Sequence, residues 1–280
     1  MSVVIDAVPL GQINGSIALA GAGKMGGALL LGWLTGGLEA GRVIVIEPQP
    51  SDEIKLVARR GIRLNPPAPE IGTVDTLVVA VKPQSFRETG ASLKQLVGPA
   101  TLVVSIMAGM TITSIAEVCG GAVVRAMPNT PAAIGRGITV AVAANDVSAD
   151  QRVVANALLR ATGAVEWTED EKLMDAVTAV SGSGPAYVFL LAEELARAGI
   201  EAGLPAELAT KLARQTVAGS GELLQRSDVA AATLRQNVTS PGGTTAAALD
   251  VLMGADGMQQ LLTRAVAAAT PAASSMSRPS

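Results

Sequence analysis

The chain has 280 residues, 49% of them hydrophobic and only 2% aromatic, and its formal net charge is -3. This length suits one large domain or two ordinary ones, and the composition predicts an aliphatic core. Because it has no histidine and a single cysteine, Cys119, the chain has no Ser-His-Asp triad and no internal disulfide, and no metal site is expected. The mildly acidic charge predicts no nucleic-acid partner, and a lone thiol is typical of a cytoplasmic protein.

Residues 16–168 alternate apolar, β-branched runs with helical patterns. Strands are predicted within 16–23, 42–47, 75–82, 100–107, 122–127, 138–144 and 164–167. Helices are predicted between them, within 26–37, 52–61, 86–97, 111–120 and 146–163. Ser148 is expected to cap the last of these helices. Continuous apolar strands that alternate with helices indicate an α/β domain with a parallel sheet covered on both faces.

After residue 168 the β-branched pattern disappears, and the chain becomes rich in Ala and Leu with breaks at SGSGP, AGLP and SPGG. This pattern predicts a C-terminal all-α domain over residues 169–280, of which residues 270–280 are expected to fray. The stretch 173–192 is long enough to span a membrane and carries only one charge, on Asp175. Because SGSGP interrupts this stretch, we expect a buried helix entry and no membrane segment.

The motif GAGKMG places Gly21, Gly23 and Gly26 in the spacing G-x-G-x-x-G, after a predicted strand and at the start of a predicted helix. In such a turn the first glycine permits a tight bend, the second lets a pyrophosphate approach the backbone, and the third allows the helix to pack closely on the strand. Free N–H groups at the helix start add partial positive charge. The motif predicts a Rossmann dinucleotide-binding domain over residues 1–168, with residues 1–15 as an N-terminal extension. The alternative is a glycine-rich turn without a ligand.

Polar or turn-forming residues follow the other strands of this series. Glu47 comes about 20 residues after the glycines, where a carboxylate meets the adenosine ribose and favours NAD over NADP. The segments 80–84, 105–111 and 125–137 follow strands that are expected to end at the same edge of the sheet, with Lys82 in the first of them. Each of these is also compatible with an ordinary surface residue or connecting loop.

The segment VTSPGGTT, residues 238–245, interrupts a helical pattern. Pro241, Gly242 and Gly243 break a helix, and Thr244 and Thr245 stand where the helical pattern restarts. Small residues at a helix start expose free N–H groups that suit an anion such as a carboxylate. One of the two threonines is expected to cap the helix, which leaves the other to contact a ligand.

The motifs GAGKMG, AVKPQ, RAMPNTPA, AVSGSGPAYVFLLAEELARAG and VTSPGGTTAAAL occur in this order within residues 16–268. Together they resemble the pyrroline-5-carboxylate reductase family, and the last motif is the most specific of them. The resemblance implies an NAD(P)H-dependent enzyme that reduces 1-pyrroline-5-carboxylate to L-proline, the last step of proline biosynthesis. It also implies that the helical domain over residues 169–280 binds substrate and pairs with a second subunit, as a homodimer or a larger ring of dimers.

The resemblance also transfers functional residues by position. The cofactor-binding positions would be Gly21, Ala22, Gly23, Lys24, Met25, Gly26, Glu47, Gln49, Ala80, Val81, Lys82, Pro83, Ile106, Met107, Ala108 and Asn237. The substrate-binding positions would be Glu171, Ser240, Gly243, Thr244 and Thr245. Thr245 matches the threonine that hydrogen-bonds the ring nitrogen, so it is the predicted catalytic residue. Asn65 is a candidate for a contact on the adenosine side.

Residues 46–50, IEPQP, depart from the small hydroxyl or basic residues that NADP-using members carry there, so both NADH and NADPH stay open as cofactors. A reductase of another cyclic imine is one alternative. A second is a β-hydroxyacid-type dehydrogenase, which would need a lysine in the segment 181–199, and this segment contains none. A third is a nucleotide-sensing protein without catalysis, which a degraded glycine motif would favour, and the motif is intact.

Overall fold

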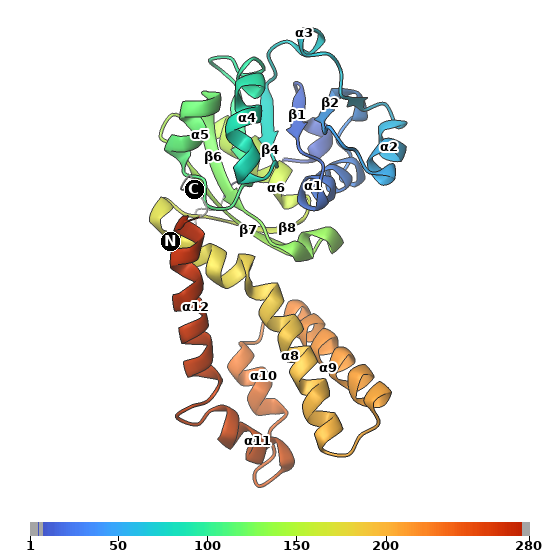
Figure 1. The fold of residues 1–280 in the computed structure, drawn as a ribbon, viewed down its shortest axis with the longest axis vertical. Coiled ribbons are helices and arrows are strands. Elements are labelled where there is room, and N and C mark those ends of the chain that lie inside the picture. Colours follow the sequence, from blue (N-terminus) through green and yellow to red (C-terminus); the bar gives the residue numbers. More distant parts are fainter. Residues whose placement is uncertain (1–4, 6–7, 276–280) are drawn as a thin grey trace. The chain divides into compact units, whose positions relative to one another are not determined.

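A single sheet organises the first part of the chain. The computed structural model describes residues 5 and 8–275. Within them the sheet has eight strands in the spatial order β3-β2-β1-β4-β5-β6-β7-β8 (Figure 1). The strands are β1 Ile17–Ala20, β2 Val43–Ile46, β3 Arg63–Leu64, β4 Thr76–Val79, β5 Leu102–Ser105, β6 Ala122–Met127, β7 Gly137–Ala143 and β8 Gly163–Trp167. The predicted fold class, an α/β Rossmann domain followed by helices, is confirmed.

Strand β7 corrects the expectation of a wholly parallel sheet. It runs antiparallel to β6, with Arg125 opposite Val142, whereas the other neighbouring strands of the sheet pair in parallel. The connection between β6 and β7 is short and contains only the helix η3 (Thr130–Ile134). Because a parallel crossover needs a dozen or more residues, the chain turns back here as a hairpin.

Helices cover both faces of the sheet and create two cores. On one face lie α1 (Lys24–Thr35), α2 (Asp52–Ala58) and α6 (Ala149–Arg160), and on the other lie α4 (Pro83–Lys94) and α5 (Ile112–Cys119). In β1, Ile17 and Leu19 join the first core, and Ala18 and Ala20 join the second. Because both faces are covered, every residue of β1, β4 and β5 is buried. Ser148 caps α6 in a capping box, as predicted.

Short elements complete the first part of the chain. They are η1 (Leu10–Gln12), η2 (Ala40–Arg42), α3 (Ala68–Ile71), η4 (Glu171–Leu173), α7 (Met174–Val177) and the π-helical η5 (Thr178–Gly182). Met174, Thr178 and Ala179 are buried. The first compact unit therefore extends to Gly182, beyond the boundary at residue 168 that the end of the strand pattern suggests, and the second unit covers Ser183–Ala269.

The second unit is entirely helical. Its helices are α8 (Gly184–Glu201), α9 (Ala206–Arg226), α10 (Ala231–Asn237), α11 (Thr244–Leu252) and the larger part of α12 (Met258–Ser275). Gly199 of α8 lets α9 come close, since a Cβ there would lie 3.3 Å from the Cβ of Ala209. No described helix is both long and apolar enough to cross a membrane.

The end of α12 reaches into the segment that the sequence expects to fray. Residues 270–275 continue the helix, whereas the sequence suggests fraying from residue 270 onward. Pro271 lies inside this helix, and Ala273 is buried, as a member of the first compact unit. Burial of an alanine-rich end favours continuation of the helix despite the N–H that Pro271 lacks. Residues 276–280 of the expected tail lie outside the described residues.

Candidate functional site

The glycine motif forms the turn between β1 and α1. Gly21 has a φ of +91°, a region that strains any residue with a Cβ, and its N–H donates to the Ile46 carbonyl at 2.8 Å. A Cβ on Gly21 would lie 2.7 Å from the carbonyl oxygen of Ala80. A Cβ on Gly26 would collide with the carbonyl oxygen of Gly21. These two glycines therefore let β1, α1 and the end of β4 approach one another.

Gly23 differs from the other two glycines because it faces open space. A Cβ there would meet no atom within 4 Å. Gly23 is the exposed N-cap of α1, no side chain caps this helix, and its first turn has no acidic residue. The first N–H groups of α1 are thus left for a ligand, together with the partial positive charge of the helix start. This surface fits a pyrophosphate, as the motif predicts.

Glu47, which follows β2, forms a hydrogen bond with the glycine turn. Its Oε2 accepts a hydrogen bond from the N–H of Ala22 at 2.8 Å, and its Oε1 accepts one from the N–H of Gln49 at 3.1 Å. Asn65 clamps the Glu47 backbone, because its Oδ1 accepts from the N–H and its Nδ2 donates to the carbonyl, both at 2.8 Å. Among the described non-glycine residues only Asn65 has a positive φ, of 49°. The Glu47 carboxylate is therefore held at one position beside the turn.

The other predicted cofactor residues of the first unit follow β4 and β5. The strand order changes direction between β1 and β4, and ligands of open α/β sheets bind beside such a switch point. The N–H of Ala80 donates to the last carbonyl of β1 at 2.7 Å, and the N–H of Ile106 donates to the last carbonyl of β4 at 3.0 Å. The side chains of Ile106 and Met107 are buried, and the N–H of Met107 donates to the Ser105 hydroxyl at 3.3 Å, so a ligand would meet the carbonyl groups of these two residues. Lys82 is exposed at the N-cap of α4.

The break at residues 238–245 separates α10 from α11. Gly242 has a φ of +67°, and Gly243 is the N-cap of α11 without any side-chain cap. The prediction that a threonine caps this helix is therefore wrong, because Thr244 and Thr245 already occupy its first two positions. No described residue forms a hydrogen bond with the hydroxyl of either threonine. Both hydroxyls and the first N–H groups of α11 are available to a ligand.

The remaining predicted residues of the second unit lie close to this helix start in the chain. The carbonyl of Ser240 accepts a hydrogen bond from the N–H of Gly243 at 3.0 Å, and the Ser240 residue is exposed. Asn237 is the exposed last residue of α10. Local chain geometry thus brings Ser240, Gly243, Thr244 and Thr245 together.

Known proteins are similar in sequence to this chain over most of its length. A pyrroline-5-carboxylate reductase of Pseudomonas aeruginosa is 38% identical over 91% of this chain and 94% of its own length. One from Synechocystis sp. is 42% identical over 84% of this chain and 89% of its own length. The chain belongs to the pyrroline-5-carboxylate reductase family. The resemblance inferred from the motifs is confirmed.

Family profiles and solved structures extend this assignment to the pyrroline-5-carboxylate reductase fold. A profile described as NADP oxidoreductase, coenzyme F420-dependent, matches residues 16–109, and one described as pyrroline-5-carboxylate reductase dimerisation matches residues 171–276. The structure of a pyrroline-5-carboxylate reductase from Coxiella burnetii is 32% identical, with a TM-score of 0.87 over 95% of this chain and all of that chain. A Plasmodium falciparum pyrroline carboxylate reductase with NADP bound is 30% identical, with a TM-score of 0.76 over 95% of this chain and 99% of that chain.

Glu171 and the other predicted substrate residues of this reductase belong to different compact units. Glu171 belongs to the first compact unit, whereas Ser240, Gly243, Thr244 and Thr245 belong to the second. Its carboxylate accepts hydrogen bonds from Arg125 and from the N–H of Ile112. Sequence reasoning missed the role of Arg125, although a charged residue inside the apolar run AVVRAM is itself a signal of a buried ion pair.

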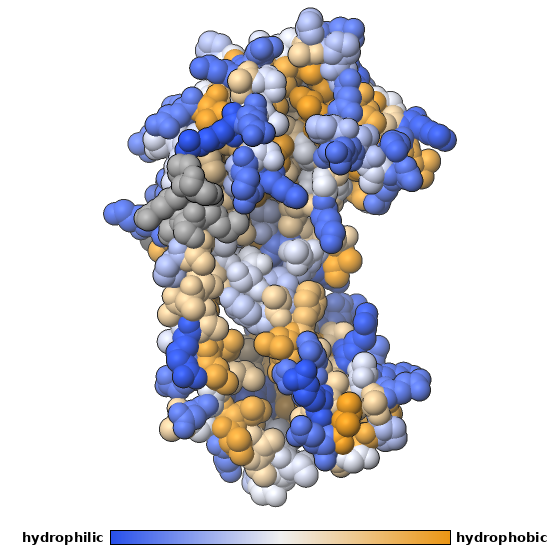
Figure 2. Space-filling model, in the orientation of Figure 1, coloured by the Kyte–Doolittle hydropathy of each residue, from blue (hydrophilic) through white to orange (hydrophobic). Residues whose placement is uncertain are grey.

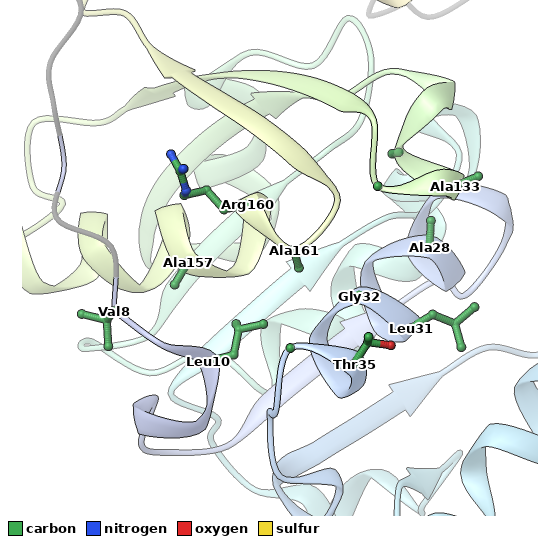
Figure 3. A pocket seen from close by; sticks show the side chains of 13 residues that line it. Val8, Leu10, Ala28, Leu31, Gly32, Thr35, Ala133, Ala157, Arg160 and Ala161 are labelled. Carbon is green, nitrogen blue, oxygen red and sulfur yellow. The ribbon is translucent and has the colours of Figure 1, made fainter. Parts of the chain in front are cut away.

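A cavity of about 540 Å³ in the first unit lies outside every predicted site of the reductase (Figure 3). It is lined by Val8, Leu10, Ala28, Leu31, Gly32, Thr35, Gly36, Ala132, Ala133, Gly135, Ala157, Arg160 and Ala161. None of these belongs to the predicted cofactor or substrate residues. Most of the lining side chains are small and apolar, and Thr35 and Arg160 are the polar exceptions.

Proposed function

We propose that this chain reduces the C=N bond of 1-pyrroline-5-carboxylate to form L-proline, with NADH or NADPH as the reductant, as the last step of proline biosynthesis. The observation that carries this proposal is the start of α11, where uncapped N–H groups coincide with two threonine hydroxyls. Identities of 38% and 42% to pyrroline-5-carboxylate reductases over most of the chain support the same substrate.

The first unit would hold the cofactor through backbone groups. The N-terminus of α1 at Gly23 would take the pyrophosphate, and the backbone of residues 80–83 and 106–108 would border the nicotinamide side. A bound nicotinamide cofactor supplies the hydride. The protein supplies orientation, a role that fits the close packing of backbone around Gly21 and Gly26.

The start of α11 would hold the substrate. Its free N–H groups and partial positive charge suit the substrate carboxylate, and Gly242 and Gly243 leave the backbone unshielded by side chains. The Thr245 hydroxyl oxygen would accept a hydrogen bond from the protonated ring nitrogen and so favour the form that accepts hydride. A hydroxyl suffices for this because a cyclic imine is basic enough to take its proton from water. No histidine is then needed as an acid, which agrees with a chain that has none.

Glu47 is the residue through which the chain would choose its cofactor. Its carboxylate is held beside the glycine turn by the N–H groups of Ala22 and Gln49. A fixed carboxylate at this place accepts hydrogen bonds from ribose hydroxyls and repels a 2′-phosphate. We propose that NADH is used more readily than NADPH, although a relative binds NADP.

The second unit needs a partner to complete its core. Within residues 183–269, all of which the structure describes, Ala209 and Ala213 are the only buried apolar side chains. Its helices instead expose large apolar residues, among them Val188, Phe189, Leu191, Leu195, Leu212, Leu223, Leu261 and Leu262. Hydrophobic patches on the face in view are orange in Figure 2. Stable monomers rarely expose so much apolar surface, and each such side chain contributes about 1.5–3 kcal/mol when it is buried.

We propose that a second copy of the chain covers this surface as a homodimer, which the match to a dimerisation profile supports. Assembly of such dimers into a larger ring is a further step of the same proposal. A cytoplasmic location fits the single reduced thiol, Cys119, and the net charge of -3 gives no basic surface for nucleic acid.

Substitution of Thr245 tests the proposed chemistry. Thr245→Ala removes the hydroxyl that would contact the ring nitrogen, so turnover of 1-pyrroline-5-carboxylate should fall roughly ten- to a hundredfold. Thr245→Ser keeps a hydroxyl and should retain most of the activity. Steady-state kinetics of the three proteins, with L-proline measured as the product, gives the answer. Equal turnover of wild type and Thr245→Ala would remove Thr245 from the reaction.

A further inference from the structure

Arg125 is a charged residue in the middle of a buried strand. It lies on β6 and only 5% of it is exposed to solvent. Its Nη1 is 3.0 Å from Oε1 of Glu171, and its Nη2 is 3.6 Å from Oδ1 of Asp175. Loss of Glu171 would leave the buried guanidinium of Arg125 with only the longer contact to Asp175. The pair therefore fixes the segment after β8 against the sheet.

Glu171 also holds the start of α5. The same Oε1 accepts a hydrogen bond from the N–H of Ile112, the first residue of this helix, at 2.8 Å. The side chain of Thr111, the N-cap, accepts from the N–H of Ser114, whereas the N–H of Ile112 has Glu171 as its acceptor. A carboxylate at a helix start also interacts favourably with the helix dipole. One oxygen of Glu171 thus connects α5 to β6.

The helix α5 starts directly after residues 106–111, which we call the β5–α5 loop. Ile106 and Met107 bury their side chains in the two cores, so this loop offers its backbone to a ligand. The position of that backbone is set on one side by β5 and on the other by the start of α5. Ile112 is the point at which the second side is anchored.

We propose that Glu171 and Arg125 act as a positioning pair for the β5–α5 loop, and that Glu171 affects the reaction through cofactor binding, without contact with the imine substrate. The proposal rests on the proposed function, because it takes this loop to border the nicotinamide cofactor. Both hydrogen bonds to Oε1 come from groups of the first unit, so this oxygen is held between the start of α5 and β6. Glu171 becomes a positioning residue in place of the substrate ligand that the family resemblance implies.

Three variants test the positioning pair. Glu171→Gln keeps an acceptor for Ile112 and loses the charge that faces Arg125, and Arg125→Lys keeps the charge and loses the planar fork. Glu169→Gln is the matched control, because Glu169 pairs with Arg152 at the same distance of 3.0 Å, and its side chain is 63% exposed. Surface pairs of this kind contribute little to stability.

The affinity for NADH and NADPH is measured by fluorescence titration, and the KM for 1-pyrroline-5-carboxylate by steady-state kinetics. Glu171→Gln and Arg125→Lys should each weaken cofactor binding roughly tenfold, with the KM of the imine unchanged. The Glu169→Gln protein should match the wild type within about twofold. A raised KM for the imine with unchanged cofactor affinity would overturn the positioning role and restore Glu171 as a substrate ligand.

Hydrogen exchange in the wild type keeps the proposal testable if the variants fail to fold. NADH alone should slow exchange at residues 106–112 and 171–175 together, and L-proline alone should slow neither. Protection of 171–175 by L-proline alone would contradict the proposal. The two proposals fail in different ways: a protein that binds cofactor but forms no L-proline contradicts the proposed function only. An active reductase whose Glu171→Gln variant binds cofactor normally contradicts the positioning pair only.

Discussion

The substitution Gly23→Ala should weaken cofactor binding and leave the free energy of unfolding almost unchanged. The added Cβ meets no protein atom within 4 Å, and the backbone at Gly23, with φ of -66° and ψ of -162°, is accessible to alanine. Alanine is a poorer N-cap than glycine by roughly 0.5–1 kcal/mol, and it reduces the entropy of the unfolded chain by a similar amount. The free energy of unfolding should therefore change by less than about 1 kcal/mol. The Cβ occupies the surface on which the pyrophosphate would lie, so cofactor affinity should fall at least about tenfold, or about 1.4 kcal/mol.

Gly26→Ala provides the contrast for this measurement. Its Cβ would collide with the backbone carbonyl of Gly21, which has no flexible side chain to move aside. This variant should lose about 1–3 kcal/mol of stability. Denaturant unfolding of both variants without cofactor gives their stabilities, and titration of each with NADH and NADPH gives their cofactor affinities. A Gly23→Ala protein that binds the cofactor as tightly as the wild type would refute the assignment of this turn to the pyrophosphate.

Three further outcomes follow from the same structure. Glu47→Ser should raise the ratio of kcat/KM for NADPH to that for NADH roughly tenfold, and a wild type that already strongly favours NADPH would contradict the role of Glu47. Phe189→Asp, in the apolar surface of the second unit, should shift the protein toward monomers in sedimentation, whereas Leu56→Asp, at a similarly exposed leucine of the first unit, should not. Burial raises the pKa of the Cys119 thiol from 9.0 to about 11, so this thiol should react with alkylating reagents at pH 8 only after unfolding. The raised pKa also means that its contribution to stability is complete below pH 9 and is lost as pH rises through 11; fast labelling of the native protein would contradict its burial.

Elements with a local cause could be predicted from the sequence. The buried strands follow from apolar runs such as TLVV and LVVS, and the start of α6 follows from Ser148 and the glutamine that completes its capping box. The glycine turn follows because only glycine adopts φ of +91° without strain at Gly21. Membership of the family follows from five motifs spread over most of the chain.

Features that depend on tertiary contacts could not be predicted. Glu171 and Arg125 are 46 residues apart, and Asn65 and Glu47 are 18 residues apart, so no local pattern connects them. The antiparallel β7 depends on the short connection that follows β6, which sequence reasoning treated as another crossover. The continuation of α12 past Pro271 depends on burial of Ala273, which the composition of the tail conceals.

The start of α11 could be predicted from the sequence only in part. The residues VTSPGGTT predict a helix that begins at this segment, and α11 does begin there. The choice of the cap was wrong by one position, because the backbone of Gly243, and neither threonine, adopts the extended conformation of an N-cap. The shift leaves both hydroxyls without a capping role, which strengthens the proposal that this helix start contacts the substrate.

The most direct test of this account is a steady-state assay of the purified, full-length protein with 1-pyrroline-5-carboxylate, with NADH and NADPH supplied in separate experiments. We predict that L-proline forms in amounts equal to the cofactor oxidised, and that kcat/KM is higher with NADH. Oxidation of neither cofactor by a folded protein that binds both would contradict the proposed reaction.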